Sequence, residues 1–553
     1  MEVIMQNIFE SSKFDILGNL QKLLSAELNS KEKARKWFLD FEELSSKTQE
    51  YYSVIELKSQ QSFNDKEVIK YKELFESKIL SRVLGARREI FLKYLNSPFK
   101  NDMHPFDNKR TEKILKVHLE LLNSENELFT LRQKENSLIE KYRLFIAKEK
   151  APFLDKTSHI SYLSSLRIHS LEEMRKESFQ SFWESISKNK DFLLKTFLEL
   201  VKNRRAQAKL SKHPYKKISH LELNKYESEN LQIENDLKIL IREKVPVLME
   251  SLINETFQKK LSCYDLSFYP EYPKSRLNDG EFSQKIECLL ENIHPKFKTI
   301  FLELKESSCL DLFSRKGKSP GTFTVPLLMS RSAFIFGNFQ SSVKDILNCM
   351  HEFGHALQIL LSYKTENFLL RNTSIGFSEF IATCFEFQSI NSLEKIGLER
   401  GQKKSHRKHH IVQLLLTICR HACIDDFESE LYNEDYEYGE TELLELWSSL
   451  YEKYFPFVEW PKNTEEFKAL FWLNTQHLFY APFYSFEYSL ANISALILFC
   501  KEESFDKERL METLRLGGQF DDSHLYSNLG IDFKSLPFLL EKLLFKLKKE
   551  LEL

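Results

Sequence analysis

The sequence predicts an all-α, mainly helical protein with one small β element. Gly and Pro are scarce, at 14 each in 553 residues, where average usage would give roughly 39 and 28. Both residues mark turns and end helices, so their scarcity favours long helices. Apolar residues also recur every three or four positions among Lys and Glu from residue 10 to about 260. This spacing is typical of helices that bury one face.

The clearest amphipathic helices are KEVIKYKELFESKILSRVLGARREIFLKYL (66–95) and KILKVHLELLNSENELFTLRQKENSLIEKYRLFI (113–146). The pattern changes between 305 and 340, where Gly, Pro and Ser surround two β-prone runs, TFTV (322–325) and AFIFGNF (333–339). These runs predict a small hairpin or a sheet edge. The basic run ERGQKKSHRKHH (399–410) predicts an exposed loop or helix end. Its three histidines could bind metal, but a solvated cationic turn is the favoured interpretation.

Composition excludes several classes of protein. Lys+Arg 79 against Asp+Glu 81 gives a net charge of −2, so no basic excess indicates nucleic acid binding. The start, MEVIMQNIFESSKFDILGN, lacks the pattern of a signal peptide, and ISALILFC (493–500) is too short to span a bilayer. Eight cysteines form no C-x-x-C pair and are typical of reduced thiols. We expect a cytoplasmic protein that binds neither nucleic acid nor membrane.

The most informative segment is the H-E-x-x-H sequence of residues 351–355, within ILNCMHEFGHALQILLS. Residues four apart lie on one helix face, so His351 and His355 can bind one metal ion. Glu352 lies beside them and can reach a metal-bound water, as in a zinc peptidase. Gly354 costs helix stability, so we expect another segment to pass close to the backbone there.

A catalytic zinc takes three protein ligands and leaves one position for water. About twenty residues after the second histidine the chain has Ser374 and Ile375, which cannot serve. The segment SIGFSEFIATCFEFQSI (374–390) offers Glu379 and Glu386, seven apart on one face of an otherwise apolar helix. We assign Glu379 as the third ligand, because a buried carboxylate is costly unless paired or metal-bound. Glu386 either steadies a ligand or belongs to an ordinary buried salt bridge.

These residues predict one zinc ion per chain, with Glu352 as general base. Glu352 would take a proton from the zinc-bound water, whose pKa the metal lowers, and deliver it to the leaving amine. The run AFIFGNF could supply an edge strand to which a peptide substrate adds by main-chain hydrogen bonds.

A second segment, FWLNTQHLFYAPFYSFEYSLANISALIL (471–498), gathers a histidine and several tyrosines among phenylalanines. Such side chains are usual donors to the oxyanion of a tetrahedral intermediate. We assign His477, Tyr484 and Tyr488 as candidate catalytic residues, and the two tyrosines, four apart, are predicted to share a helix face. An aromatic core stripe is the alternative interpretation.

The chain resembles the M3 metallopeptidases, the group of thimet oligopeptidase and oligoendopeptidase F, and is most similar to the bacterial oligoendopeptidase F branch. The resemblance covers roughly residues 311–533, and the helical N-terminal portion is compatible with it. It rests on FIFGNFQSSVKDILNCMHEFGHALQ, SEFIATCFEFQS and HLFYAPFYSFEY, with RKGKSPGTF upstream and LRLGGQF…LGIDF near the C-terminus. The ordered set is far more specific than H-E-x-x-H alone.

The resemblance implies a two-lobed helical enzyme with zinc on the floor of a deep central channel, which admits short unfolded peptides and excludes folded proteins. The expected parts are an N-terminal helical lobe (1–190) and a catalytic M3 domain (191–553). By this resemblance the metal ligands are His351, His355 and Glu379, the catalytic carboxylate is Glu352, and His477 with the tyrosines of the 480s stabilises the transition state. The expected activity is zinc-dependent hydrolysis of internal peptide bonds in oligopeptides.

One departure from the family leaves two alternatives. Many relatives read F-Y-V-Y or P-F-Y-Y where this chain has Pro-Phe-Tyr-Ser-Phe (482–486), so Tyr484 and Tyr488 are both candidate oxyanion donors. Phe486 also leaves open a catalytically weakened scaffold that only binds peptides.

A carboxylate di-iron bundle is the other alternative. Glu352-x-x-His355 has a counterpart at Glu291-Asn292-Ile293-His294. Against this interpretation, Pro295 follows directly and His351 would have no role.

Overall fold

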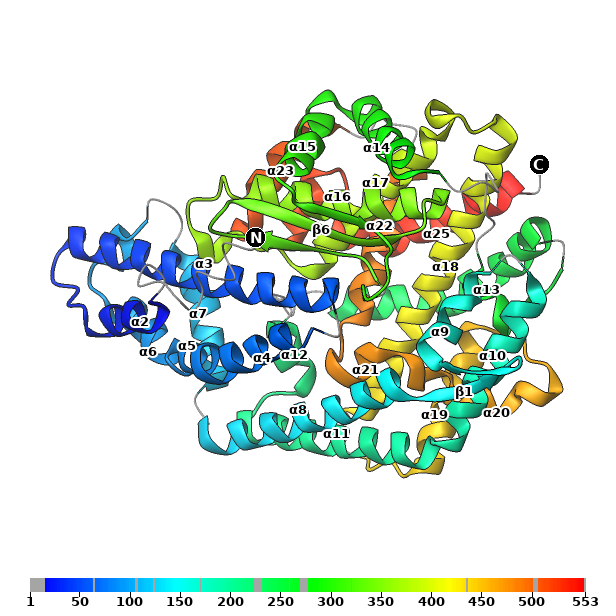
Figure 1. The fold of residues 1–553 in the computed structure, drawn as a ribbon, viewed down its shortest axis with the longest axis horizontal. Coiled ribbons are helices and arrows are strands. Elements are labelled where there is room, and N and C mark those ends of the chain that lie inside the picture. Colours follow the sequence, from blue (N-terminus) through cyan, green and yellow to red (C-terminus); the bar gives the residue numbers. More distant parts are fainter. Residues whose placement is uncertain are drawn as a thin grey trace.

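The computed structural model describes residues 15–62, 65–104, 108–122, 125–169, 171–222, 231–257, 259–268, 277–319, 321–433, 436–500 and 506–551. The first fourteen residues, which enter the signal-peptide prediction, and Pro320 of the RKGKSPGTF segment lie outside these ranges. Within them the protein is mainly helical with small sheets, so the predicted fold class is confirmed (Figure 1).

The N-terminal half consists almost entirely of helices, as its spacing predicts. The expected helix of residues 66–95 is broken by a π-helical turn, η2 (Glu76–Leu80). The first helices have their own apolar cluster, which includes Trp37, Phe38 and Tyr94, whereas α8, α10, α11 and α13 contribute to the large core shared with the second half. The helices are α2 (Ile16–Ser25), α3 (Lys31–Gln61), α4 (Lys66–Phe75), α5 (Ser81–Gly85), α6 (Arg87–Asn96), α7 (Asn108–Leu122), α8 (Glu125–Lys148), α9 (Ile160–Ser165), α10 (Glu172–Lys188), α11 (Lys190–Ser211), α12 (Tyr215–Glu222) and α13 (Leu231–Phe257).

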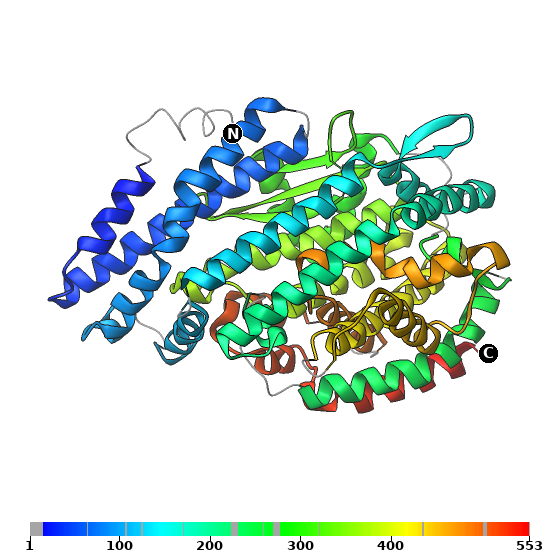
Figure 2. The same cartoon turned by 90° about the horizontal axis from the view of Figure 1, so that it is seen from below.

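The second half continues with helices that enclose the H-E-x-x-H segment. The last helix, α25, packs alongside α13 although the two are far apart in the sequence (Figure 2). The helices are α14 (Asp279–Ile293), α15 (Pro295–Glu306), α16 (Val343–Ser362), α17 (Ile375–Asn391), α18 (Arg400–Leu431), α19 (Glu440–Tyr454), α20 (Glu465–Leu470), α21 (Gln476–Tyr480), α22 (Ser485–Cys500), α23 (Lys507–Arg515), α24 (Asp522–Asn528) and α25 (Leu536–Leu551).

The predicted hairpin is confirmed as β5 (Phe323–Leu327) paired antiparallel with β6 (Ser332–Phe339). The expectation that AFIFGNF is an edge strand is wrong. A third strand, β4 (Leu310–Phe313), pairs parallel with the other side of β6, so β6 is central and β5 and β4 are the edges. The four residues LDLF are too few to show a strand period, which is why the sequence did not reveal them.

Two small additional strand pairs were also not predicted. They are β1 (Lys150–Phe153) with β2 (Lys156–His159), and β3 (Leu261–Ser262) with β7 (Val458–Glu459).

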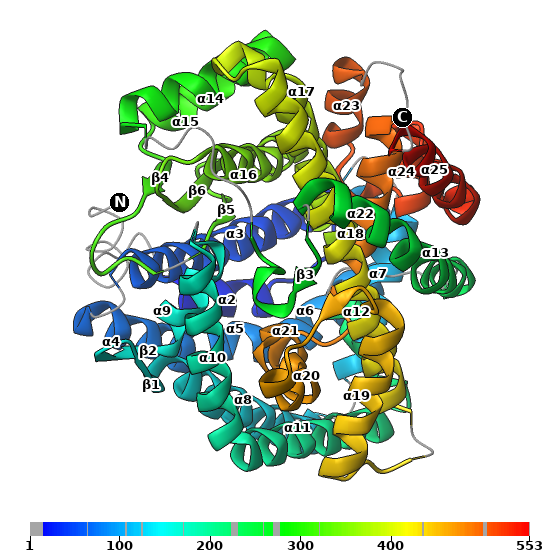
Figure 3. The ribbon, with the colours of Figure 1, turned by 90° about the vertical axis from the view of Figure 1, so that its right-hand side faces the viewer.

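Four helices at the centre of the second half pack in series: α16 against α17, α17 against α22, and α22 against α18 (Figure 3). The expectation for Gly354 is confirmed, because a Cβ there would lie 2.8 Å from the Cα of Ala382 on α17. A side chain at this position would force α16 and α17 apart. The glycine therefore sets the distance between the two helices that carry the predicted metal ligands.

The run 399–410 is a helix end, one of its two predicted forms, but it is not a solvated turn. Glu399 caps α18 and the run is its first three turns, with His406, His409 and His410 buried. The ring of His410 packs on Phe387 at 5.0 Å, so the apolar face of α18 begins within the basic run.

None of the helices in the described part of the chain combines the length and apolarity that a bilayer span requires.

Candidate metal centre

The helix α16 carries both histidines of the H-E-x-x-H sequence. Its start is fixed by Ser342, whose hydroxyl accepts from the backbone N–H of Asp345 while the Asp345 carboxylate accepts from that of Ser342. His351 and His355 follow one turn apart on the same face, with ring centroids 4.9 Å apart. The i, i+4 geometry predicted from the sequence is therefore present.

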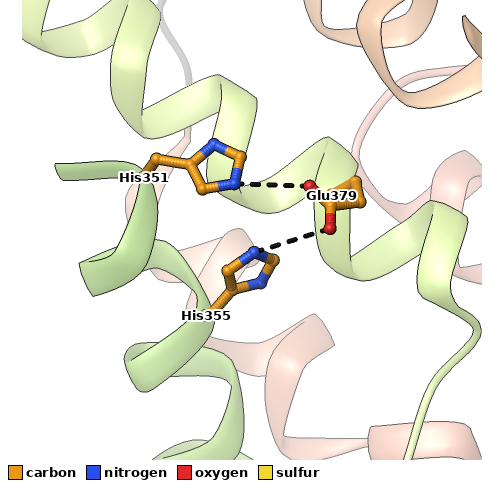
Figure 4. A group of neighbouring side chains, drawn as sticks. All are labelled: His351, His355 and Glu379. Atoms are coloured by element: carbon orange, nitrogen blue, oxygen red, sulfur yellow. Dashed lines mark ion pairs between the residues drawn. The ribbon is translucent and has the colours of Figure 1, made fainter. Parts of the chain in front are cut away.

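Glu379, on α17, faces both imidazoles (Figure 4). His351 Nε2 lies 3.3 Å from Glu379 Oε2, and His355 Nε2 lies 3.8 Å from Glu379 Oε1. One ligand atom from each of the three residues lies within 4.8 Å of the others. Among the described residues, this is the one group of histidine, cysteine or carboxylate side chains close enough to hold a metal ion.

The other nitrogen of each ring is already hydrogen-bonded. His351 Nδ1 lies 2.7 Å from Glu386 Oε1, and His355 Nδ1 lies 2.9 Å from Ser378 Oγ. Donation from Nδ1 leaves the lone pair of Nε2 directed at Glu379, as metal-bound histidines require. Glu386 thus contacts a predicted ligand directly, and it also lies 3.9 Å from Lys344 Nζ.

The chemistry of these donors fits a zinc ion. Two imidazoles and one carboxylate are a usual catalytic zinc set. Glu379 Oε2 is buried and has no well-oriented hydrogen-bond donor among the described residues, although the His351 ring is near. A buried carboxylate oxygen without a donor is costly, and a cation bound between the three side chains would satisfy it.

The pKa values reflect an excess of carboxylate around the histidines. Burial alone would lower the pKa of His351, but Glu379 and Glu386 raise it well above its usual value. Burial would raise the pKa of Glu386, yet Lys344 and His351 lower it to about 2. Opposing effects of the same kind lower the pKa of Glu379. Both carboxylates are therefore ionised at neutral pH, and the site favours a positive charge.

Glu352 is buried on α16 and turns toward the sheet. The hydroxyl of Thr324, on the edge strand β5, lies 2.8 Å from Glu352 Oε2 and 3.0 Å from the Glu352 carbonyl oxygen. The negative charge of Glu352 also acts on His355, where it opposes the burial that lowers the pKa of that ring. The predicted general base is thus next to the metal ligands and is held by a residue of β5.

The three predicted aromatic residues form one cluster, which we call the tyrosine half of the site. Tyr484 Oη and Tyr488 Oη lie 3.0 Å apart, and the His477 ring stacks on Tyr484 at 5.0 Å. Burial, and then the charge of Glu379, hold the pKa of Tyr488 well above its usual value. The charge of Glu379 thus acts on Tyr488, so this cluster adjoins the metal ligands.

The prediction that both tyrosines lie on one helix is wrong for Tyr484. The helix α22 begins at Ser485, and Tyr484 follows a turn in which Phe483 has the left-handed φ of 60°. The buried carboxylate of Glu428 accepts from the Phe483 backbone N–H at 2.9 Å and holds this turn. Tyr484 therefore directly precedes the helix, and the turn at Phe483 leads into it.

Three residues of the site were not predicted: Thr324, Ser378 and His421. Thr324 and Ser378 contact side chains that lie 28 and 23 positions away in the sequence, and no spacing rule indicates a hydroxyl partner. His421, on α18, lies with its ring 4.9 Å from that of Tyr488 and has a buried Nδ1 without a hydrogen-bond partner in the described chain. A lone histidine on an apolar helix gives no signal of such a position.

The second E-x-x-H sequence does not join this site. His294 caps the start of α15 and lies 3.1 Å from Glu508, while Glu291 pairs with Lys298. Neither residue belongs to the ligand group described above, so the geometry does not support a di-iron site.

Comparisons with known proteins agree with this geometry. The sequence profile described as "Peptidase family M3" matches residues 166–544. The chain is 22% identical over 480 residues to "Oligoendopeptidase F, plasmid" of Lactococcus lactis subsp. cremoris, covering 82% of this chain and 77% of that protein. It is 22% identical over 380 residues to "Oligopeptidase PepF" of Bacillus subtilis (strain 168), covering 66% and 54%.

Solved structures share the fold. "PZ peptidase A with inhibitor 2" aligns with a TM-score of 0.84 at 18% identity, over 98% of this chain and 97% of that one. The oligoendopeptidase F of Enterococcus faecium aligns with a TM-score of 0.59 at 15% identity, over 99% of both. Because the family profile covers more than half of the sequence, the chain belongs to peptidase family M3.

Proposed function

We propose that this chain is a zinc-dependent endopeptidase that hydrolyses internal bonds of short, unfolded oligopeptides. The observation that carries the proposal is the convergence of His351, His355 and Glu379 on one position, with the far nitrogen of each ring already hydrogen-bonded. These three side chains would hold one zinc ion. When bound, zinc would polarise the scissile carbonyl and lower the pKa of water.

Glu352 acts as the general base and acid. Its carboxylate takes a proton from the attacking water and returns it to the leaving amine. The Thr324 hydroxyl, 2.8 Å from Glu352 Oε2, holds the carboxylate in place. Since Glu352 is buried beside His355, it can reach a reacting group bound next to the metal ligands.

Tyr488 donates to the oxyanion that forms on the scissile carbonyl, and Tyr484 supports it through the contact between their hydroxyls. Burial and Glu379 raise the pKa of both phenols, so both remain protonated donors at neutral pH. Burial lowers the pKa of His477, which is therefore a neutral ring that packs on Tyr484.

The substrate class follows from the family and from the names of the relatives, "Oligoendopeptidase F" and "Oligopeptidase PepF". We propose that a channel between an N-terminal lobe (1–190) and the catalytic part (191–553) limits access to unfolded peptides. We also propose that the enzyme works in the cytoplasm. All eight cysteines are free thiols, as that compartment favours.

An internally quenched peptide tests the proposal. We expect the purified chain to cleave it, to lose activity with a chelator and to regain it with zinc, while a folded protein of the same composition resists cleavage. Binding of the peptide without cleavage would instead support a weakened scaffold. Metal analysis that finds two irons per chain would overturn the zinc assignment.

A further inference from the structure

Two guanidinium groups near the tyrosine half form no ion pair with any carboxylate that the structure describes. Arg420, on α18, lies over the Phe471 ring at 5.9 Å, and Arg167, in the short helix η4 (Leu166–Ile168), lies over the Phe182 ring at 4.6 Å. The Nε and Nη2 atoms of Arg167 are buried and have no hydrogen-bond partner in the described parts of the chain. Neither arginine forms an ion pair with a described residue.

Arginines whose whole side chains are buried are neutralised by carboxylates in this protein. Arg175 pairs with Asp265 at 2.7 Å, and Arg204 pairs with Glu135 at 2.5 Å. Leaving a desolvated charge unpaired is costly. Burial, and then the charge of Arg420, lower the pKa of Arg167 to about 9, so Arg167 still carries a positive charge at neutral pH. This excess of positive charge is therefore available to an anion.

Arg420 lines a cavity of about 140 Å³ between α18, α19 and the short helix η9 (Phe471–Asn474). The residues that line it include Trp447, Tyr451, Phe471 and Thr475. A water molecule in the liquid takes about 30 Å³, so the space suits a carboxylate on a short stem. Arg420 remains exposed to solvent there, so an incoming anion can reach it.

Two chain segments carry both residues of the cavity and residues of the tyrosine half or its neighbour His421. Thr475 lies two residues before His477. Arg420 directly precedes His421, whose ring is 4.9 Å from that of Tyr488. Besides burial, Arg420 and His477 both contribute to the lowered pKa of His421, so the guanidinium lies close to the tyrosine half.

We propose that this cavity is a carboxylate-binding subsite in which Arg420, reinforced by Arg167, recognises a carboxylate of the peptide substrate. The inference rests on the proposed peptidase function. A guanidinium binds a carboxylate through two parallel hydrogen bonds, and the aromatic walls accept the apolar stem. The carboxylate is either the C-terminus of the peptide or a Glu or Asp side chain.

Matched quenched peptides test the subsite. One is fully neutral with an amidated C-terminus, one has a free C-terminal carboxylate, and a third carries Glu where the neutral peptide has Gln. We expect the parent chain to favour a carboxylate peptide in kcat/KM. Because a hydrogen bond to a charged group contributes roughly 1.5–3 kcal/mol, Arg420→Gln should reduce the ratio of carboxylate to neutral peptide by about tenfold or more.

The controls separate charge from structure. Arg420→Lys should keep part of the preference, and Arg167→Gln should weaken it. Arg400 is an exposed arginine about 30 Å away along the same helix. Arg400→Gln should leave the preference for carboxylate peptides unchanged. Removal of an uncompensated charge should not lower the melting temperature. If Arg420→Gln has a much lower melting temperature and unchanged selectivity, Arg420 stabilises the fold and the subsite proposal is wrong.

The peptides also identify the source of the carboxylate. Loss of the preference on amidation assigns the subsite to the C-terminus, and loss on Glu→Gln exchange assigns it to a side chain. A parent chain without preference contradicts the inference. Binding of the same labelled peptides to Glu352→Gln, followed by fluorescence anisotropy, reads the preference without turnover, so failure of the subsite is distinguishable from failure of the proposed function.

Discussion

The two halves of the site differ in how the chain positions them. The metal half, His351, Glu352, His355, Glu379 and Glu386, lies on the two long helices α16 and α17, which pack closely at Gly354. The tyrosine half, defined above, depends on a short helix, a left-handed turn and the first turn of α22. Regular helices thus place the predicted metal ligands, while an irregular segment places the predicted oxyanion donors.

The largest expected effect is on the metal half, at Glu352. Glu352→Gln keeps the shape of the side chain but removes the base, so kcat should fall by up to about 10⁴-fold. Zinc content should stay at the parental level, because the three ligands are untouched. Cleavage of the quenched peptide at the parental rate by this variant would refute the mechanism.

The next effect sharpens the distinction between the halves. Tyr488→Phe removes the hydroxyl that interacts with Glu379, and kcat should fall by about 10²–10³-fold without loss of zinc. Tyr484→Phe should have a smaller effect, because its hydroxyl acts through Tyr488. Tyr162→Phe, at an exposed tyrosine, is the control. Equal decreases in kcat for the two variants would contradict the assignment of Tyr488 as the direct donor and Tyr484 as its support.

A change at Glu386 tests whether hydrogen bonds around the metal half matter for binding. Glu386→Gln weakens the contact with His351 Nδ1, so zinc affinity should fall by about 10–100-fold. Competition with a chromogenic chelator measures this, and Glu394→Gln, at an exposed surface ion pair, is the control. Unchanged affinity would identify Glu386 as part of an ordinary salt bridge with Lys344.

The smallest effect concerns stability beside the tyrosine half, at His421. Burial, Arg420 and His477 lower the pKa of His421 to about 3, against about 6.5 in the unfolded chain. Between these values the unfolded chain binds more protons, so His421 reduces stability as pH falls below about 6.5. In metal-free protein, the melting temperature of His421→Gln should fall less than that of the parent between pH 7.5 and 5.5. An identical fall would show that His421 does not contribute.

The sequence predicted the metal half residue by residue because helical periodicity converts spacing into geometry. His351 and His355 share a face at i, i+4, and Glu379 and Glu386 lie on one face of α17, so each reaches its partner once the helices pack. The close approach of the two helices at Gly354 was also expected, because a glycine inside a helix lowers helix stability and is usually explained by close packing.

The remaining features have no such period. The left-handed turn at Phe483 depends on the distant carboxylate of Glu428, and the Thr324 contact with Glu352 depends on the pairing of β5 and β6. The central position of β6 required the four-residue strand β4, and the buried histidines of α18 required the packing of that helix. All of these are tertiary contacts, which local pattern does not encode.

Stoichiometric zinc titration of the chelated protein, with peptide cleavage followed at each step, tests the central claim most directly. We predict that activity rises linearly and stops at one zinc per chain, and that Glu379→Ala neither binds zinc tightly nor regains activity. Full cleavage by the metal-free protein, or a parental titration by Glu379→Ala, would contradict the claim that His351, His355 and Glu379 hold the catalytic metal.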